Sequence, residues 1–457
     1  MAIPLKVPKL EKELGIETYA SQSLGIGGKI RHFPEDFLVE EILANGAKAA
    51  VQPAEILQPV GEGRYLICVL VKRDWDTLRA VKKIARRMGV SHKRVQIAGI
   101  KDAKALTAQH ISIRGATPEQ VSWVRIKDIA LRPVRFSDEK VYSHLLLGNK
   151  FHIIIRAISH PSSLIEERVK NVQDELSRLG GFPNFFGHQR FGTVRPLTHL
   201  VGGCLVRGNL EEAALTYLAQ PSPYEHPESR EARQELRDTQ DFREALRSFP
   251  IYLRYERLML TQLARRQNDF LGAFRNLPLK LRRLLIQAYQ SFLFNKFLSR
   301  RMKQGVGLKE PQVGDYVMNV DSRGLQTTKF SQVTSQSLST VKKAFEEGVM
   351  RVGIPLIGYK QQPSDGVQGE IEREILEAEN LAPRDFYVSS MPETSAPGRL
   401  RTILASIIDF SVEEASRDSE SLRKRKMGLD FTLHRGSYAT VLLREFMKPR
   451  NLIKAGF

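Results

Sequence analysis

The hydrophobic period of the chain changes between residues 74 and 115, and this change constrains the fold more than any other feature of the sequence. Apolar side chains recur at helical spacing from 74 to 89, where Gly89 marks the end of a predicted helix. They then alternate with polar side chains at 95–97 and again at 111–113, with the sequence GIKDAK between them. This order predicts a helix followed by a strand, a loop and a strand. The predicted apolar face of the helix comprises Leu78, Val81, Ala85 and Met88.

Other segments show the same two periods. Residues 33–41 (FPEDFLVEE) are typical of a turn leading into a strand, and residues 64–72 and 429–433 also have strand patterns. The sequence TPEQ at 117–120 has the residues of a helix capping box, and a long helix is predicted after Pro278. Because the alternating strands are expected to be half-buried, they favour an antiparallel or mixed sheet with helices on one side, which is an α+β fold.

The length of 457 residues exceeds what one hydrophobic core usually supports, so two or three domains are expected. The composition shifts from about residue 208, and the charged, proline-containing stretch at 219–249 is interpreted as a connection between domains. A second unit is therefore expected to begin near residue 208.

The chain carries 70 Lys and Arg against 51 Asp and Glu, a formal net charge of +19. This excess predicts a polyanionic partner, because basic proteins gain affinity for nucleic acids by releasing phosphate counterions. A membrane fits less well, since the sequence has no acylation site, amphipathic anchor or apolar stretch of about 18 residues. The alternative is a basic surface that binds nothing. With no signal peptide and with Cys68 and Cys204 expected to be reduced and buried, the predicted location is the cytoplasm.

The familiar cofactor and metal motifs do not occur in the sequence. There is no GxxxxGK[ST] phosphate loop, no GxSxG nucleophile elbow, no HExxH and no EF-hand loop. The GIGG sequence at 25–28 lacks the flanking strand and helix of a dinucleotide-binding fold and is interpreted as a turn. The ten histidines are scattered, so no protein-bound metal is expected.

Two short segments have compositions suited to chemistry. Asp102 lies in the predicted loop, flanked by Lys101 and Lys104, and is either a catalytic carboxylate or a turn former in a solvated ion pair. Residues 184–192 (NFFGHQRFG) combine aromatic rings, amides and an arginine between glycines. This second segment either stacks on a nucleobase and hydrogen-bonds it, or forms an aromatic turn that fills the core.

Several segments, in order along the chain, resemble the TruD family of pseudouridine synthases. The GxKD and NxFGxQRFG motifs are the most specific of them, and the resemblance covers roughly residues 25–450. The matching segments are FPEDFLVEE at 33–41, AGIKDAKALTAQHISI at 98–113, LGNKFHIIIR at 147–156, GFPNFFGHQRFG at 181–192 and RGSYATVLLRE at 435–445.

The resemblance implies the fold shared by pseudouridine synthases. The catalytic domain is then an α+β domain with a mixed, largely antiparallel sheet, split between residues 1–207 and 396–457. An α/β TRUD insertion domain is implied at residues 208–395.

The resemblance also implies roles for single residues. Asp102 matches the essential aspartate of the GxKD motif, and Arg31 occupies the place of a basic residue near that carboxylate. Phe37 matches an aromatic residue that contacts the substrate. Asn184 matches an amide that holds the target, and Phe186 matches an active-site aromatic residue where other synthase families use tyrosine.

Two positions depart from the family pattern. Tyr438 stands where some relatives have phenylalanine, so a stacking role is implied and a role for its hydroxyl is left open. Ala103 follows the motif aspartate where a basic residue is common, which weakens an implied phosphate contact without changing the assignment of Asp102.

The implied reaction converts uridine to pseudouridine by breaking the bond from the base nitrogen to ribose and rejoining the base through carbon. It involves no net redox change, so no cofactor is expected. Asp102 acts either as a nucleophile or as a base that removes a sugar proton, and Arg31 favours its charged form. The three aromatic residues replace lost base stacking, worth about 1–3 kcal/mol per base, while Asn184 reads a uracil edge.

The resemblance implies tRNA as the partner, with uridine 13 of the D arm as the target, and the length favours the archaeal branch. The basic helix at 78–88 and the RKRK loop at 423–426 are predicted to contact phosphates, the alternative for the helix being a solvated face. A monomer is favoured.

Two other functions compete with this interpretation. One is an RNA-binding protein that has lost catalysis, which the intact GIKD and NFFG segments disfavour. The other is an RNA methyltransferase, which needs a glycine-rich strand-to-helix turn that is not found in the sequence.

Overall fold

The computed structural model describes residues 5–52 and 59–457. The contacts divide the chain into two compact units. Unit 1 comprises Met1–Ala20 and Pro183–Leu404, and unit 2 comprises Ser21–Phe182 and Ala405–Phe457. The short strands β7 (Phe182–Pro183) and β12 (Leu404–Ala405) lie where the chain passes from one unit to the other. Helices and mixed sheets confirm the predicted α+β class.

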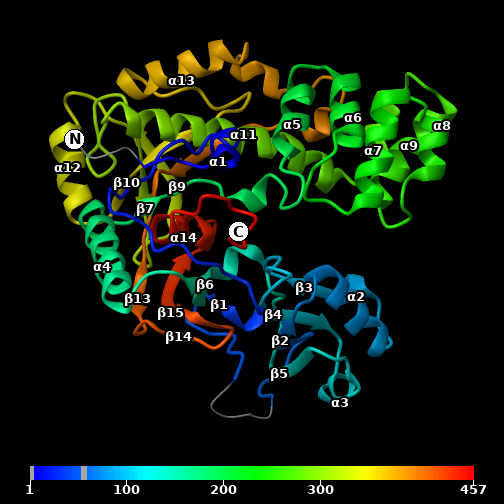
Figure 1. The fold of residues 1–457 in the computed structure, drawn as a ribbon, viewed down its shortest axis with the longest axis horizontal. Coiled ribbons are helices and arrows are strands. Elements are labelled where there is room, and N and C mark those ends of the chain that lie inside the picture. Colours follow the sequence, from blue (N-terminus) through cyan, green and yellow to red (C-terminus); the bar gives the residue numbers. More distant parts are fainter. Residues whose placement is uncertain (1–4, 53–58) are drawn as a thin grey trace. The chain divides into compact units, whose positions relative to one another are not determined.

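Unit 2 is built on a sheet that has nine strands within its described residues. The main path runs β13-β15-β6-β1-β4-β2-β5, with β14 on β15 and β3 on β4 (Figure 1). The pairing of β1 with β4 is parallel and the other pairings are antiparallel, so the sheet is mixed and largely antiparallel, as predicted. The strands are β1 (Phe37–Leu43), β2 (Tyr65–Arg73), β3 (Val95–Ile97), β4 (Leu106–Arg114), β5 (Ile129–Ser137), β6 (Leu146–Ile158), β13 (Ile408–Val412), β14 (Ser416–Asp418) and β15 (Ser421–His434).

Two of the helices of unit 2, α2 and α3, begin at residues that cap them through side-chain hydrogen bonds. Asp76 caps α2 through its side chain, and Thr117 and Gln120 form the predicted capping box of α3. Helix α2 packs on β2, β3 and β4 through an apolar cluster that includes Ala80 and Ile84. The helices are α2 (Thr77–Arg87), α3 (Pro118–Ser122), α4 (Ser162–Leu179) and α14 (Ala439–Met447).

Two sequence expectations for unit 2 are wrong. Leu78 was expected on the buried face of α2, but it is 49% exposed because Thr77, Ala80 and Ile84 form that face. The RKRK segment at 423–426 was expected to be a loop, but it lies inside β15. Its backbone pairs with the neighbouring β14 in a hairpin and, at Arg425, with Ile158 of β6, and these pairings extend the strand although the side chains are charged.

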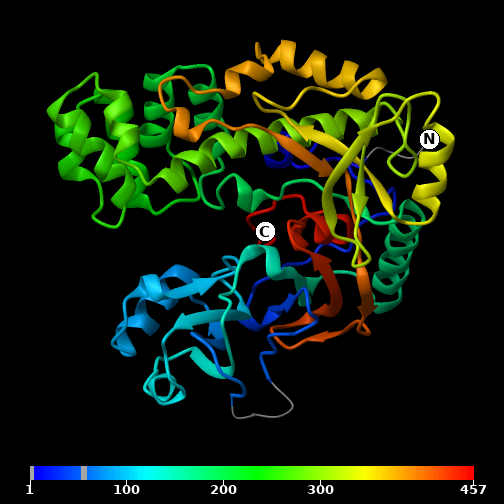
Figure 2. The ribbon, with the colours of Figure 1, turned by 180° about the vertical axis from the view of Figure 1, so that it is seen from behind.

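Unit 1 combines many helices with a four-stranded antiparallel sheet of order β11-β10-β8-β9. The long helix α11, predicted after Pro278, contacts β10, α5 and α13, and its apolar side chains are mostly core. In Figure 2 the green helices α6–α10 group at one end of unit 1 and the strands at the other. The helices are α1 (Lys9–Glu13), α5 (Thr198–Val206), α6 (Leu210–Ala219), α7 (Pro227–Thr239), α8 (Phe242–Ser248), α9 (Arg254–Arg265), α10 (Phe270–Arg275), α11 (Leu279–Lys303), α12 (Leu338–Glu346) and α13 (Gly366–Ala378). The strands are β8 (Tyr316–Val320), β9 (Gln326–Gln332), β10 (Met350–Leu356) and β11 (Arg399–Thr402).

The charged stretch at 219–249 is part of this helical region rather than a connection between domains. It contains α7 and α8. Arg233 of α7 is 1% exposed, and it pairs with Glu225 at 3.0 Å and with Glu256 at 2.7 Å. A charged, apolar-poor sequence can therefore be core-facing when its ions are paired.

The compact units have bounds that differ from the predicted domain bounds. Helices α5 and α6, which contact each other, lie on either side of residue 208, so the contacts continue across that position. The assignment of residues 1–207 and 396–457 to catalysis and of 208–395 to an insertion stays a prediction. Cys68 and Cys204 are buried free thiols, as expected. None of the helices at 5–52 or 59–457 is long and apolar enough to cross a membrane.

Candidate active site

Asp102 is presented by the loop between β3 and β4 in unit 2. Neighbouring side chains hold the backbone of this loop: the Lys72 ammonium donates to the Asp102 carbonyl oxygen at 2.6 Å. The Thr77 hydroxyl contacts the backbone nitrogen and oxygen of Lys101 at 3.1 and 3.2 Å. The Asp102 side chain remains 38% exposed, so a fixed backbone presents a carboxylate that solvent or a substrate can reach.

Arg31 lies beside this carboxylate. The backbone of Lys29 pairs with Arg156 of β6, and two residues later Arg31 takes a left-handed φ of 56°. Its Nη2 is 3.2 Å from Asp102 Oδ1, and its Nη1 donates to the Gly456 carbonyl at 2.8 Å. Burial lowers the pKa of Arg31, and Asp102 opposes that shift. A guanidinium nevertheless stays protonated in proteins, so the pair is ionic.

Phe37 lies beneath Arg31 and is almost fully buried. The guanidinium carbon of Arg31 is 3.9 Å from the centre of the Phe37 ring, a cation–π distance. The ring of Phe151 meets the Phe37 ring edge-on, with 6.2 Å between the ring centres. With 1% of its surface exposed, Phe37 supports Arg31 here, and its predicted contact with substrate stays a prediction.

Lys101 does not pair with Asp102, although it precedes it in sequence. Its ammonium lies 2.8 Å from Glu41 Oε2 and donates to Asn149 Oδ1 at 2.7 Å. Although burial opposes the shift, the hydrogen bond from His110 and the charge of Lys101 lower the pKa of Glu41. Glu41 thus draws Lys101 into the protein, and among the described residues it is Arg31 that pairs with the Asp102 carboxylate.

Tyr438 belongs to unit 2 as well, at the residue that precedes α14. Its backbone is extended, with φ of −114°, and its side chain is half-buried. The residues brought together in unit 2 are therefore Asp102, Arg31 and Phe37. Asn184 and Phe186 belong to unit 1 and form a separate cluster there.

The amide of Asn184 is engaged within unit 1. Its Oδ1 accepts from Arg401 Nη2 at 2.6 Å, and its backbone oxygen accepts from Arg401 Nε at 3.0 Å. Its Nδ2 donates to the carbonyl oxygen of Thr402 at 3.0 Å. Asn184 is 5% exposed, so its side chain anchors Arg401 in this structure.

Phe186 completes the cluster. Its backbone nitrogen donates to Asn295 Oδ1 at 2.8 Å, and its ring meets Phe294 edge-on at 5.6 Å. The guanidinium of Arg401 lies 4.1 Å from the Phe186 ring centre. The Asn184 amide, the Arg401 cation and the Phe186 ring are thus one connected arrangement.

Sequence reasoning missed several residues that build both clusters. Lys72 ends an apolar strand, RYLICVLVK, and a lysine in that position was a signal for a buried partner. Arg401 and Asn295 gave no local signal, because they meet Asn184 and Phe186 from distant parts of the chain.

One group among the described residues has the composition of a metal site. His152, Glu413 and Asp430 each offer a ligand atom, and these atoms lie within 4.8 Å of one another. His152 and Asp430 face each other across β6 and β15, with 3.1 Å between Nδ1 and Oδ2. A hydrogen bond between His152 and Asp430 accounts for this contact, and Glu413 is exposed.

Comparisons with known proteins agree with the motifs. The family model described as tRNA pseudouridine synthase D (TruD) matches residues 13–446. A protein of Methanosarcina mazei called "Probable tRNA pseudouridine synthase D" is 38% identical over 449 residues, which is 98% of this chain and 99% of that protein. A protein of the same description from Thermococcus onnurineus is 38% identical, covering 94% of this chain and 97% of its own.

A solved structure gives the same result. The crystal structure of a TruD protein from Methanosarcina mazei superimposes with a TM-score of 0.81 at 39% sequence identity, covering 97% of this chain and 98% of that one. The chain therefore belongs to the tRNA pseudouridine synthase D (TruD) family.

Proposed function

We propose that the chain isomerises a specific uridine of tRNA to pseudouridine in the cytoplasm, with uridine 13 of the D arm as the target and the Asp102 carboxylate as the catalytic group. Family membership supports the reaction class. The observation that supports Asp102 is its 38% exposed side chain on a loop fixed by Lys72 and Thr77, beside the Arg31 cation.

The reaction requires no group beyond the carboxylate and water. The bond from N1 to ribose C1′ breaks, a bond from C5 to C1′ forms, the proton leaves C5, and N1 ends protonated. Asp102 serves either as the nucleophile at the sugar or as the base that removes a sugar proton, and both routes need the ionised carboxylate. Arg31 contacts Oδ1, which leaves Oδ2 for the ribose.

The remaining family roles are proposed with the contacts that support them. Phe37 positions Arg31 through the cation–π contact. Tyr438 is half-buried, and its ring is proposed to stack on the base of the target. Asn184 is proposed to act by holding Arg401 against Phe186, since reading a uracil edge requires it to release Arg401 and Thr402.

The proposed tRNA surface includes α2. Its sequence TLRAVKKIARR contains no acidic residue, and all five of its cations are exposed. In the part of the chain that the structure covers, none of these cations has a carboxylate at ion-pair distance. Unpaired cations on one helix are suited to phosphate contacts. Arg423 in β15 is also exposed and is the best phosphate contact of the RKRK segment.

Asp102→Asn tests the proposal directly. Purified protein is incubated with unmodified tRNA transcript and no cofactor, and pseudouridine is mapped chemically. The variant keeps the size of the side chain and loses the charge, so the rate is expected to fall by about 10³-fold or more, while tRNA binding is retained. The matched control is Asp138→Asn, another loop aspartate in an arginine pair, which is 73% exposed and should leave the rate unchanged.

Each outcome distinguishes a competing function. An Asp102→Asn variant with the wild-type rate would show that another residue carries the chemistry. If the wild type bound tRNA tightly but made no pseudouridine on any tRNA tried, the RNA-binding function without catalysis would replace the proposal. Pseudouridine only at another position would refute uridine 13 as the target.

A further inference from the structure

Unit 1 contains a cavity of about 490 Å³, and two of its lining residues, Phe186 and Arg190, belong to the NFFGHQRFG segment. Phe186 lies at one wall, helix α11 forms a second wall, and the turn that leads into β11 forms a third. None of the described lining residues is acidic. The lining residues are Phe186, Arg190, Arg283, Gln287, Gln290, Ser291, Leu356, Thr394, Ser395, Ala396, Pro397, Gly398 and Arg399.

The arginines give this cavity a positive potential. Arg283 uses its Nε to donate to the Glu393 carbonyl at 2.8 Å, and Arg399 is exposed at the start of β11. Within residues 5–52 and 59–457, neither of these two arginines has a carboxylate within ion-pair distance. Arg190 contributes a third cation, positioned by Ser291 at 3.1 Å. Guanidinium groups at the rim of a cavity without a carboxylate favour a bound anion.

The wall opposite α11 is preformed. Gly398 has φ of 87°, and a Cβ on it would lie 2.8 Å from the Leu356 carbonyl oxygen. A Cβ on Gly358 would lie 2.2 Å from the Gly398 nitrogen, so both glycines are needed for the close approach of the two turns. The backbone nitrogens of Tyr359 and Lys360 donate to Ala396 and Pro397 at 3.1 and 3.0 Å. The Thr394 hydroxyl of this turn donates to the Met391 carbonyl at 2.7 Å. The Ser395 hydroxyl accepts from the Val388 nitrogen at 3.0 Å, so its own proton can be donated to a ligand in the cavity.

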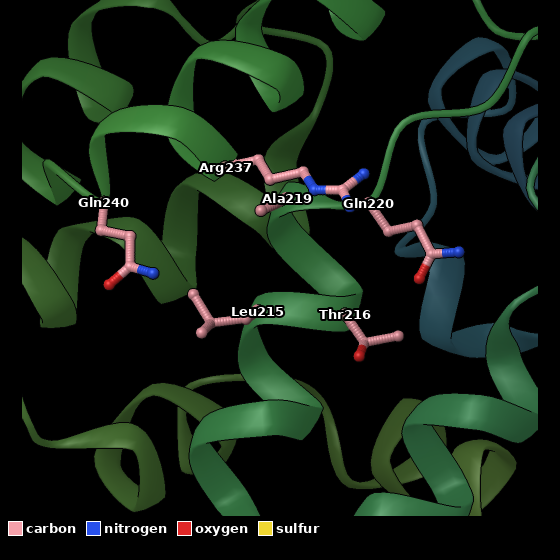
Figure 3. A pocket seen from close by; sticks show the side chains of 6 residues that line it. All are labelled: Leu215, Thr216, Ala219, Gln220, Arg237 and Gln240. Carbon is pink, nitrogen blue, oxygen red and sulfur yellow. The ribbon is translucent and has the colours of Figure 1, made fainter.

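The other cavities of unit 1 lack this arrangement. A cavity of about 280 Å³ beside α6 and α7 has one cation, Arg237, whose side chain extends over Ala219 toward Gln220 (Figure 3). A cavity of about 510 Å³ near α8 and α9 has Asp241 among its lining residues, beside Arg243 and Arg265. The cavity at Phe186 is the one of these three that combines three arginines with no carboxylate.

We propose that the cavity at Phe186 binds a backbone phosphodiester of the RNA substrate, with Arg283 and Arg399 as the principal donors. This inference rests on the proposed function for its choice of RNA over a free anion. A phosphodiester fits because its two non-bridging oxygens can accept from the guanidinium groups and from the Ser395 hydroxyl, and because a phosphate contact releases counterions. Because Phe186 lines the cavity, a phosphate bound there would lie next to the NFFG motif.

The test uses the full-length double variant Arg283→Gln/Arg399→Gln, in which both altered residues are exposed. The dissociation constant for unmodified tRNA is measured at several salt concentrations, with the wild type and with Arg237→Gln of the Figure 3 cavity as the matched control. The affinity at 0.15 M salt is expected to fall about tenfold, and the salt slope by about 0.7–0.9 for the loss of one phosphate contact, while the control changes neither. Unchanged affinity and slope in the double variant overturn the proposal.

A second arm separates RNA from a small anion. Inorganic phosphate binding is measured calorimetrically on the same proteins. If the double variant loses phosphate binding but keeps its affinity for tRNA, the site takes a free anion and the RNA assignment is wrong. Because binding is measured without turnover, loss of tRNA affinity in the double variant supports the site even if no pseudouridine is formed, so failure of the proposed function is recognised separately.

Discussion

Asp102 and Asn184 come from the two most specific motifs of the chain, but their side chains are held in opposite ways. Asp102 in unit 2 is 38% exposed, and the contacts around it fix the loop backbone and one carboxylate oxygen. Asn184 in unit 1 is 5% exposed, and both ends of its amide are bonded within the protein. One motif presents a partly exposed carboxylate, whereas the polar group of the other is bonded to Arg401, whose guanidinium lies against Phe186.

This difference matters for how family motifs are interpreted. A motif residue that is exposed on a fixed loop is expected to act on substrate, and its replacement should affect the rate more than the stability. A motif residue whose hydrogen bonds are all internal is expected to act through the residues it holds, and its replacement should affect stability. The following substitutions separate these two cases.

The largest effect is expected from Arg31→Met. The substitution removes the cation from Asp102 Oδ1 and the donor to Gly456, while a side chain of similar length still covers Phe37. The turnover number is expected to fall by about 10²- to 10³-fold, because the pair orients the carboxylate. Single-turnover kinetics measure this. Arg31→Lys keeps the charge but cannot serve both acceptors in the fork geometry, so it should be intermediate; equal rates for Lys and Met would exclude a charge effect.

Glu372 lies deep in unit 1 and is fully buried, whereas the carboxylate of Asp102 is partly exposed. Burial raises its pKa from 4.5 to about 7, although Ser364 and Gln368 donate to it. A folded-state pKa above the unfolded value means that the contribution to stability is complete below about pH 4.5 and is lost as pH rises through about 7. Each pKa unit of difference between the folded and unfolded states is worth about 1.4 kcal/mol, so the unfolding free energy falls by about 3 kcal/mol in total.

Glu372→Gln should remove this pH dependence. Urea unfolding at pH 5 and pH 8 is expected to show a smaller difference for the variant than for the wild type. Glu379→Gln is the control, because the pKa of Glu379 is shifted in the opposite direction. Burial opposes this shift, but Lys296 lowers the pKa of Glu379 below its ordinary value of 4.5. The contribution of Glu379 to stability is therefore lost only as the pH falls below that value. If Glu372→Gln and the wild type lost stability equally between pH 5 and 8, Glu372 would not be the source.

Asn184→Ala should cost about 1–3 kcal/mol of unfolding free energy, because it leaves the buried guanidinium bond from Arg401 unmade. Urea unfolding measures the change. Asn276→Ala, at an exposed asparagine that donates to Gln262, should change stability much less. Unchanged stability together with a reduced rate would show that Asn184 acts on the substrate after all, and the contrast with Asp102 would disappear.

The sequence predicted local elements well and long-range contacts poorly. The strand–loop–strand around GIKDAK and the capping box at 117–120 were predicted because periodicity and capping act over a few residues. Leu78 was misplaced because the buried face of α2 is lined partly by small residues, which carry little hydrophobic signal. The strand at 423–426 pairs not only with the neighbouring β14 but, at Arg425, with Ile158 of the distant β6, which no local pattern shows.

The candidate site shows the same division. Family motifs indicated Asp102, Arg31 and Asn184, and the structure adds that Arg31 lies 3.2 Å from the carboxylate. The inward turn of Lys101 toward Glu41 could not be predicted, because Lys101 and Asp102 are neighbours in sequence but their side chains have different partners. Arg401 reaches Asn184 from a distant strand, so only the three-dimensional structure identifies it.

The smallest effect is expected on α2, where exposed cations contribute through charge alone. Arg79, Lys82, Lys83 and Arg86 lie at helical spacing on one face, and changing all four to Gln should weaken tRNA binding about tenfold, or about 1.4 kcal/mol. The salt slope should fall by at least about 1. The control Lys342→Gln/Lys343→Gln alters exposed lysines of α12 in unit 1.

Variants of α2 and of Asp102 are expected to affect different steps, tRNA binding in the first case and conversion of bound tRNA in the second. The α2 variant should bind tRNA more weakly but convert bound tRNA at the wild-type rate under single-turnover, saturating conditions, because its cations touch neither Asp102 nor Arg31 in any contact of the described residues. If the saturated rate also fell, α2 would be positioning the target rather than only attracting RNA. An unchanged affinity and an unchanged salt slope would instead leave α2 as an ordinary solvated face, and the phosphate contacts would have to come from elsewhere.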